Sequence, residues 1–221
     1  MKATRSLCSC HTPDGAQLVL HEHDGHYFLR IDGVQLMSTT ASASEQTMAE
    51  LACNGLPAAK QRILIGGLGF GFTLRRVLEC CAADAIIDVA ELLSEVITWN
   101  RAHLQSVNGL LLDDPRVRIH LRDVYELLDG KQRYDAILLD VDNSPDALVQ
   151  TGNARLYNHG GMQRVMAALQ PKGRVVYWSA HRDRSFAKVL GRVFKQVECV
   201  DAKAYPKAKR FTHTLFVADR D

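Results

Sequence analysis

The stretch of sequence that decides the fold is RILIGGLGFGFTLRRV, residues 62–77. Its apolar run, residues 63–65, is suited to a strand that is buried on both faces. The glycines that follow let the chain turn sharply and let a ligand approach the backbone, where a side chain would collide with it. A helix beginning near Phe72 presents free N–H groups and the positive end of its dipole. Residues 62–77 therefore predict a strand, a ligand-binding turn and a helix.

The glycine spacing indicates which nucleotide the turn binds. Gly67, Gly69 and Gly71 form the pattern G-x-G-x-G. The dinucleotide fingerprint is G-x-G-x-x-G, and its sixth position, counted from Gly67, is Phe72. A dehydrogenase is therefore not expected, and the spacing favours the S-adenosylmethionine-binding form of the sheet. The alternative is a glycine-rich turn that only packs tightly.

Strands and helices alternate from residue 62 onward. Seven strands are predicted, at residues 63–65, 85–90, 117–121, 135–139, 174–178, 196–200 and 212–217. The helices between them are predicted at 72–81, 93–104, 124–128, 159–169 and 184–194. This alternation implies right-handed crossovers and a doubly wound, mostly parallel α/β sheet. No convincing helix separates the last two strands, so the last strand is expected to run antiparallel.

The first 40 residues have a different pattern, typical of a small β-meander. Three short strands are predicted at 17–23, 26–31 and 34–37. They are joined by Asp24-Gly25 and Asp32-Gly33, which are strong hairpin-turn signals. A helix is expected over residues 44–54. We therefore predict an N-terminal β-meander domain over residues 1–43 and an S-adenosyl-nucleotide-binding domain over residues 44–221.

The composition is that of a globular protein, with 47% hydrophobic and 24% charged residues in a chain of 221. No apolar run approaches the roughly 18 residues of a membrane span, and the first 15 residues lack the apolar core of a secretory signal. We expect a cytoplasmic protein with a small-molecule substrate. The net charge of +2 does not indicate nucleic-acid binding. A basic run between the last two strands is interpreted as a solvated loop, or alternatively as a rim that attracts an anionic substrate.

The six cysteines do not form the framework of a disulfide-stapled secreted domain. The segment Cys8-Ser9-Cys10-His11 lacks the spacings of structural zinc sites. We therefore expect reduced thiols and no metal.

Three carboxylates follow predicted strands at the edge where parallel sheets bind ligands. Glu91 ends the second strand and can accept hydrogen bonds from ribose hydroxyls. Asp123 follows the third strand and can accept from an adenine amino group, cap the next helix, or do both. Asp140 ends the fourth strand, where it is a candidate general base or a clamp for a cationic substrate. The alternative for Asp140 is an aspartate that only initiates a turn.

Several blocks of the sequence, from about Tyr27 to Val217, together resemble the spermidine synthase-like family of the class I methyltransferase fold. These blocks are IDGVQ at 31–35, ILIGGLGFGFTLRRV at 63–77, Glu91 with Val96-Ile97, DPRV at 114–117, YDAI at 134–137 with Asp140, and LQPKG at 169–173. The resemblance implies an N-terminal β domain ahead of a seven-stranded sheet, and a homodimer.

The resemblance also implies roles for individual residues. Gln35 and Glu91 would contact the ribose end of the adenosyl cofactor, and Asp123 with Val124 would contact the adenine. The backbone of Gly67, Gly69 and Gly71 would line the amino-bearing tail. Asp140 would match the acid that takes a proton from the attacking amine.

The sequence departs from polyamine synthases where those enzymes have acidic or polar residues. The glycine loop has Phe70 in place of an acid, Ser44-Glu45 replaces a Tyr-Gln pair, and Leu93 replaces an aspartate. The D-S-x-D-P loop reads Asp140-Val141-Asp142-Asn143-Ser144, so its second acid becomes an amide. Because a di-cationic amine needs carboxylate partners, Asp142 and Glu45 are the expected substitutes, and Asn143 is expected beside them at the substrate-binding site.

Three functions follow from this pattern. Methyl transfer from S-adenosylmethionine to a small nucleophile is favoured, because the polyamine-specific acids are missing. Aminopropyl transfer from decarboxylated S-adenosylmethionine to a polyamine is the close alternative, because the blocks as a whole resemble those of the synthases. The third is a nucleotide-binding or dimerisation module without turnover, against which the retained Glu91, Asp123 and Asp140 argue.

Overall fold

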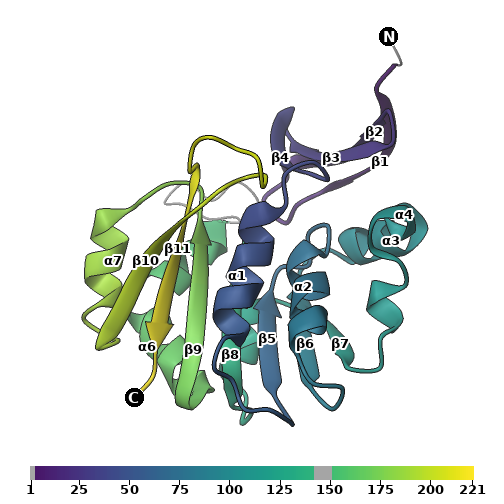
Figure 1. Ribbon diagram of the computed structural model, residues 1–221. Coiled ribbons are helices and arrows are strands. Elements are labelled where there is room, and N and C mark those ends of the chain that lie inside the picture. Colours follow the sequence, from purple (N-terminus) through teal and green to yellow (C-terminus); the bar gives the residue numbers. More distant parts are fainter. Residues whose placement is uncertain (1–2, 142–150) are drawn as a thin grey trace.

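Two β-sheets form the framework of the chain (Figure 1). The computed structural model describes residues 3–141 and 151–221, with only the backbone described for residues 151–153. The first sheet has four strands and the second has seven. Among the described helices, none is long and apolar enough to cross a membrane.

The N-terminal sheet is an antiparallel meander in the order β1-β2-β3-β4. Its strands are β1 (Arg5–His11), β2 (Gln17–His23), β3 (His26–Ile31) and β4 (Val34–Ser38). Asp24-Gly25 and Asp32-Gly33 make the two predicted turns, and all four residues have positive φ angles, as type I′ hairpin turns require. The strand β1 was not predicted. Its residues are exposed or half-buried and a bulge interrupts its pairing with β2, so no clean alternation marks it.

The seven-stranded sheet has the order β10-β11-β9-β8-β5-β6-β7. Its strands are β5 (Arg62–Gly66), β6 (Ile86–Glu91), β7 (Val117–Leu121), β8 (Tyr134–Leu139), β9 (Leu169–Ser179), β10 (Gln196–Ala202) and β11 (His213–Asp219). All pairs are parallel except those of β11, which runs antiparallel to both β9 and β10. The predicted strand number, parallel order and antiparallel last strand are confirmed.

Helices cover both faces of this sheet, as Figure 1 shows for α1 and α2 on the near side and α6 behind. They are α1 (Ala43–Cys53), α2 (Phe72–Cys80), α3 (Ser94–Ala102), α4 (Gln105–Asn108), α5 (Val124–Leu127), α6 (His159–Ala168) and α7 (Arg184–Leu190). Short 3-10 helices lie at Leu111–Asp113 and Thr151–Tyr157. The doubly wound α/β class is therefore confirmed.

The central strand β5 shows why the sheet is buried on both faces. Ile63 and Ile65 belong to the core cluster that includes residues of α1, α2 and α3, whereas Leu64 belongs to the cluster on the other face. All three side chains are fully buried. The carboxyl end of β5 then delivers the chain into the glycine turn.

Two helices differ from their predicted lengths. The helix predicted over 93–104 ends at Ala102, and α4 follows it as a separate short turn. The helix predicted over 184–194 ends at Leu190, and turns follow it. Leu190 and, beyond the helix, Phe194 are both buried. The apolar spacing therefore continues past the helix end and gives no signal for its termination.

Candidate active site

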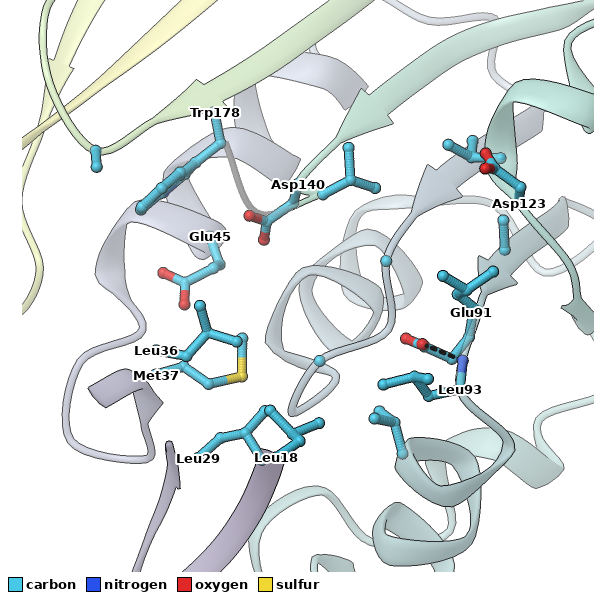
Figure 2. Close-up of a pocket in the computed structure, with 18 of the residues that line it drawn as sticks. Leu18, Leu29, Leu36, Met37, Glu45, Glu91, Leu93, Asp123, Asp140 and Trp178 are labelled. Carbon is cyan, nitrogen blue, oxygen red and sulfur yellow. Dashed lines mark hydrogen bonds between the residues drawn. The ribbon is translucent and has the colours of Figure 1, made fainter. Parts of the chain in front are cut away.

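A pocket of about 350 Å³ lies between the N-terminal sheet and the carboxyl ends of the central parallel strands. The meander contributes Leu18, Leu29, Gln35, Leu36 and Met37, and the helix α1 contributes Glu45. The opposite wall comes from the glycine turn and from residues that end or follow β6, β7 and β8. Figure 2 shows the acidic residues distributed around this space.

Two glycines of the turn are required by close approach as well as by backbone angle. Gly67 has a φ of +87°, and a Cβ there would lie 2.5 Å from the backbone oxygen of Asp140. Gly69 has a φ of +49°, and a Cβ there would lie 2.8 Å from the Cε atom of Met37. Both line the pocket. Gly71, by contrast, caps α2 with a φ of +81° and lies against Leu111 instead of the pocket wall.

Side-chain amides hold the glycine turn in place. Nδ2 of Asn100 donates to the backbone oxygen of Gly69 at 2.8 Å, and Nδ2 of Asn108 donates to that of Phe70. Neither asparagine was predicted from the sequence, because each lies about 30 residues or more beyond the turn and is brought to it by α3 and α4. The turn is therefore positioned by hydrogen bonds from the chain's own side chains.

Glu91 is buried beside this turn. One carboxylate oxygen accepts from the backbone N–H of Leu68 at 3.0 Å, and the other accepts from that of Leu93 at 2.9 Å. Burial raises the pKa of Glu91, while these backbone donors act in the opposite direction. The backbone N–H groups of Leu92 and Gly69 also act on this carboxylate, so the carboxylate is held at the pocket wall by the turn and the segment after β6.

Asp123 begins the short helix α5 and does cap it. Its Oδ1 accepts from the backbone N–H of Tyr125 at 2.8 Å, and its Oδ2 is paired with Arg155. The Arg155 guanidinium also lies over the Tyr125 ring, 4.2 Å from its centroid. Arg155 was not predicted, because no sequence pattern marks it as a neighbour of Asp123. Asp123 and Val124 both line the pocket, so capping leaves the carboxylate at the pocket wall.

The other end of the pocket gathers Asp140, Glu45 and Trp178, which Figure 2 shows near one another. Thr73 lies with its Oγ1 3.5 Å from an Asp140 carboxylate oxygen. Glu45 accepts a hydrogen bond of 2.6 Å from the Ser44 hydroxyl, and burial raises the pKa of Glu45.

An aromatic pair completes this end of the pocket. The ring of Trp178 lies against that of His213, with centroids 4.6 Å apart and planes tilted by 38°. Burial lowers the pKa of His213, so its imidazole is neutral at pH 7. Neither residue was predicted. They become neighbours because β11 pairs with β9 at the register that sets Leu215 opposite Trp178.

The pocket brings together most of the predicted site residues. Those that line it are Gln35, Gly67, Gly69, Glu91, Asp123, Val124, Asp140 and Glu45. Asp142 and Asn143 lie outside the described residues. Phe70, which occupies the position of an acid in the synthases, points into the core, where it is 3% exposed and meets Phe72 edge-to-face. Leu93 lines the pocket and makes that part of its wall apolar.

Known proteins resemble this chain in both sequence and fold. A polyamine aminopropyltransferase of Corynebacterium efficiens is 35% identical over 128 residues, which are 56% of this chain and 23% of that protein. A spermidine synthase of Coffea arabica is 30% identical over 150 residues, which are 66% of this chain and 45% of that protein. In sequence, this chain is therefore similar to spermidine synthases and polyamine aminopropyltransferases. It matches less than half the length of these curated relatives, and no protein-family model matches it.

The structural comparison supports the same relationship. A solved spermidine synthase in complex with the transition-state analogue AdoDATO aligns with a TM-score of 0.78 and 20% identity, covering 98% of this chain and 73% of that one. The resemblance predicted from the sequence and the predicted fold are therefore confirmed.

One prediction is corrected by these relatives. The sequence hypothesis favoured methyl transfer, because acids typical of polyamine synthases are missing. The curated relatives are spermidine synthases, spermine synthases and polyamine aminopropyltransferases, so they support the alternative instead. The sequence hypothesis relied on the acids that are missing from the loops. In the structure, Glu45 of α1 lines the pocket and supplies a carboxylate there.

Proposed function

We propose that this chain transfers an aminopropyl group from decarboxylated S-adenosylmethionine to a diamine or polyamine. The observation that carries the proposal is the division of one pocket into two chemically distinct ends. Glu91, Asp123 and the glycine backbone form one end, and Asp140, Glu45 and Trp178 form the other. A nucleotide donor and a cationic acceptor would thus meet in a single cavity.

The donor end suits an adenosine with a short cationic tail. The carboxylate of Glu91 would accept from the ribose hydroxyls, with Gln35 at the same wall, and Asp123 with Val124 would hold the adenine. Gly67 and Gly69 keep the backbone open where a Cβ would block the tail. Among the described lining residues the one arginine is Arg122, which adjoins Asp123 at the adenine side, whereas the tail would lie against glycine backbone and carboxylates. We therefore infer that a tail without a carboxylate is preferred.

The acceptor end suits an amine with two nitrogen atoms separated by an alkyl chain. Asp140 would hold the attacking nitrogen, and Glu45 would pair with the distal ammonium. Leu36, Met37 and the neighbouring leucines of the meander offer an apolar wall for the methylene groups. The Trp178 ring adds a face that attracts a cation. Glu45 thereby replaces the acids that the sequence lacks.

For this reaction the protein has to align the acceptor with the donor and to remove a proton from the attacking amine. The sulfonium donor supplies an activated carbon, to which the amine nitrogen bonds as the carbon–sulfur bond breaks and methylthioadenosine leaves. Asp140 accepts the proton that the nitrogen loses on forming this bond. Glu45 and the apolar wall hold the acceptor in line with the donor carbon, which lowers the entropic part of the barrier.

Isothermal calorimetry with decarboxylated S-adenosylmethionine, S-adenosylmethionine and methylthioadenosine tests the donor assignment. We expect the decarboxylated form and methylthioadenosine to bind, and the decarboxylated form to bind more tightly than S-adenosylmethionine. Tighter binding of S-adenosylmethionine would contradict the proposal. If none of the three bound, a module without turnover would be the better description.

Three wider assignments are part of the same proposal. We propose a homodimer, a cytoplasmic location, and a division into a β-meander domain at residues 1–43 and a nucleotide-binding domain at residues 44–221. The resemblance to the spermidine synthases supports the first and third, and size-exclusion chromatography with light scattering tests the dimer.

A further inference from the structure

The helices α1 and α2 lie side by side (Figure 1), and two cysteine side chains meet at one end of this contact. Cys53 is the last residue of α1, and Cys81 caps the carboxyl end of α2. Their Sγ atoms are 3.7 Å apart, and both side chains are half-buried. The first turn of α1 carries Glu45 and the turn before α2 carries Gly67 and Gly69, so the sulfur atoms lie at the helix ends away from the pocket.

The two thiols are chemically unequal. The hydrogen bond from Cys53 and the nearby Arg116 guanidinium lower the pKa of Cys81. The same hydrogen bond, together with burial, raises the pKa of Cys53. Arg116 is fixed by Asp114, at 2.8 Å, and by the backbone oxygen of Leu78, at 3.0 Å. Cys81 is therefore the thiol of this pair that loses its proton more readily, which makes it the expected nucleophile.

We propose that Cys53 and Cys81 form a reversible disulfide that fastens α1 to α2. The geometry needs only a small movement, because the sulfur atoms have to approach from 3.7 Å to about 2.05 Å. The proposal does not depend on the proposed transferase activity, since neither sulfur atom lines the pocket.

The oxidant is a low-molecular-weight disulfide. The Cys81 thiolate attacks one sulfur of that disulfide, forms a mixed disulfide and releases one small thiolate. Cys53 then loses its proton and attacks the Cys81 sulfur, which releases the second small thiolate. Two protein thiols are oxidised and one small disulfide is reduced to two thiols. Such bridges in reducing compartments are transient, so the reaction is expected to reverse with excess reductant.

The neighbouring Cys80 provides an internal competitor. It is exposed, and it adjoins Cys81 in the chain. If solvent exposure determined which thiol reacts, Cys80 would form the mixed disulfide with the small thiol or would pair with Cys81. If the short distance between the Sγ atoms determines which disulfide forms, the bridge joins Cys53 to Cys81 and Cys80 stays a thiol.

Peptide mapping after equilibration with oxidised glutathione tests the proposal on the full chain. After free thiols are alkylated, we expect a linked peptide pair containing Cys53 and Cys81, a mass lower by about 2 Da for the bridge, and alkylated Cys80. Dithiothreitol should restore the original mass. A Cys80–Cys81 or Cys53–Cys80 link, or glutathione retained on Cys81, would overturn the proposal.

Serine variants supply the matched comparison. Cys80→Ser and Cys199→Ser should still form the bridge, whereas Cys53→Ser and Cys81→Ser should not. In the wild-type chain the oxidised form should melt about 5 °C or more above the reduced form, because the bridge restricts the unfolded state. A bridge that forms without raising the melting temperature would contradict its role in fastening the helices. The wild-type linked peptide decides the question even if a serine variant folds poorly.

Discussion

At Gly67 a side chain meets two obstacles, a φ of +87° and the Asp140 backbone oxygen 2.5 Å from its Cβ position. We expect Gly67→Ala to lower the free energy of unfolding by about 2–3 kcal/mol. Gly109 is the matched control, because its φ is +67° but nothing lies within 4 Å of a Cβ. Gly109→Ala should cost only about 1 kcal/mol. If urea unfolding gave equal losses in the free energy of unfolding for the two variants, the contact with the Asp140 backbone oxygen would contribute nothing to the cost.

Glu45 tests whether the acceptor is di-cationic. We expect Glu45→Gln to raise the KM for a diamine by about 10-fold or more, because a charge-assisted hydrogen bond is lost. The KM for the donor should change little. Glu50→Gln, in the same helix but paired with Arg76 at the surface, should leave both values unchanged. An unchanged KM for the diamine in Glu45→Gln would remove Glu45 from the acceptor site.

The same residue predicts a pH dependence. Because burial raises the pKa of Glu45, this side chain becomes neutral at a higher pH than an exposed glutamate does. The neutral form does not pair with an ammonium, so the KM for the diamine should rise as the pH falls through the raised pKa. Glu45→Gln should lose this acid-side rise. A rise that persists in the variant would assign the titration to another group.

Asp140 is proposed to act on the attacking nitrogen and not on the donor. We expect Asp140→Asn to lower kcat by about 100-fold or more, because a general base contributes that much. Calorimetric binding of methylthioadenosine should be retained, since the amide keeps the size of the side chain. Full turnover in Asp140→Asn would refute the assignment of the base.

Among the elements, the strand β6 carries a buried charge that holds three strands together. Asp88 is 1% exposed, and its carboxylate is 2.7 Å from Arg62 of β5 and 2.8 Å from His120 of β7. We expect Asp88→Asn to destabilise the fold by about 3 kcal/mol, because Arg62 loses its charge partner in a largely buried setting. Asp129→Asn, which breaks a surface pair with Arg164, should cost less than about 1 kcal/mol. Chemical denaturation of both variants measures the two losses in the free energy of unfolding. Equal losses would contradict this prediction.

The elements that could be predicted from sequence are those whose local signals agree. The run at 63–65 is apolar at every position, and the resulting strand is buried on both faces. Asp24-Gly25 and Asp32-Gly33 fix their turns through backbone preference alone. The strand β1 has neither signal, because it lies at the sheet edge and is largely exposed. The end of α7 was missed for the opposite reason, since buried apolar residues continue beyond it.

For the molecule as a whole, one rule of sheet topology predicted much of the candidate site. Residues at the carboxyl ends of parallel strands meet at one edge, which brought Glu91, Asp123 and Asp140 to the same pocket. The residues that were missed reach the pocket by other routes. Trp178 and His213 meet through antiparallel pairing, and Asn100 reaches the glycine turn from a helix. Such contacts join distant parts of the chain and leave no local pattern.

The choice between methyl and aminopropyl transfer also depends on contacts between distant parts of the chain. Phe70 and Leu93 stand at positions where polyamine synthases have acids, and this favoured methyl transfer from the sequence alone. In the folded chain Phe70 is buried in the core, and Glu45 enters the pocket from α1. The charge near the acceptor is therefore a property of the tertiary structure and not of the loop sequence.

Product analysis by mass spectrometry tests the proposed reaction most directly. The purified chain would be incubated with a diamine and either decarboxylated S-adenosylmethionine or S-adenosylmethionine, and the amine and nucleoside products would be identified. We predict an aminopropylated amine and methylthioadenosine from the decarboxylated donor, both greatly reduced with Asp140→Asn. A methylated product with S-adenosylhomocysteine from S-adenosylmethionine, or no product from either donor, would contradict aminopropyl transfer.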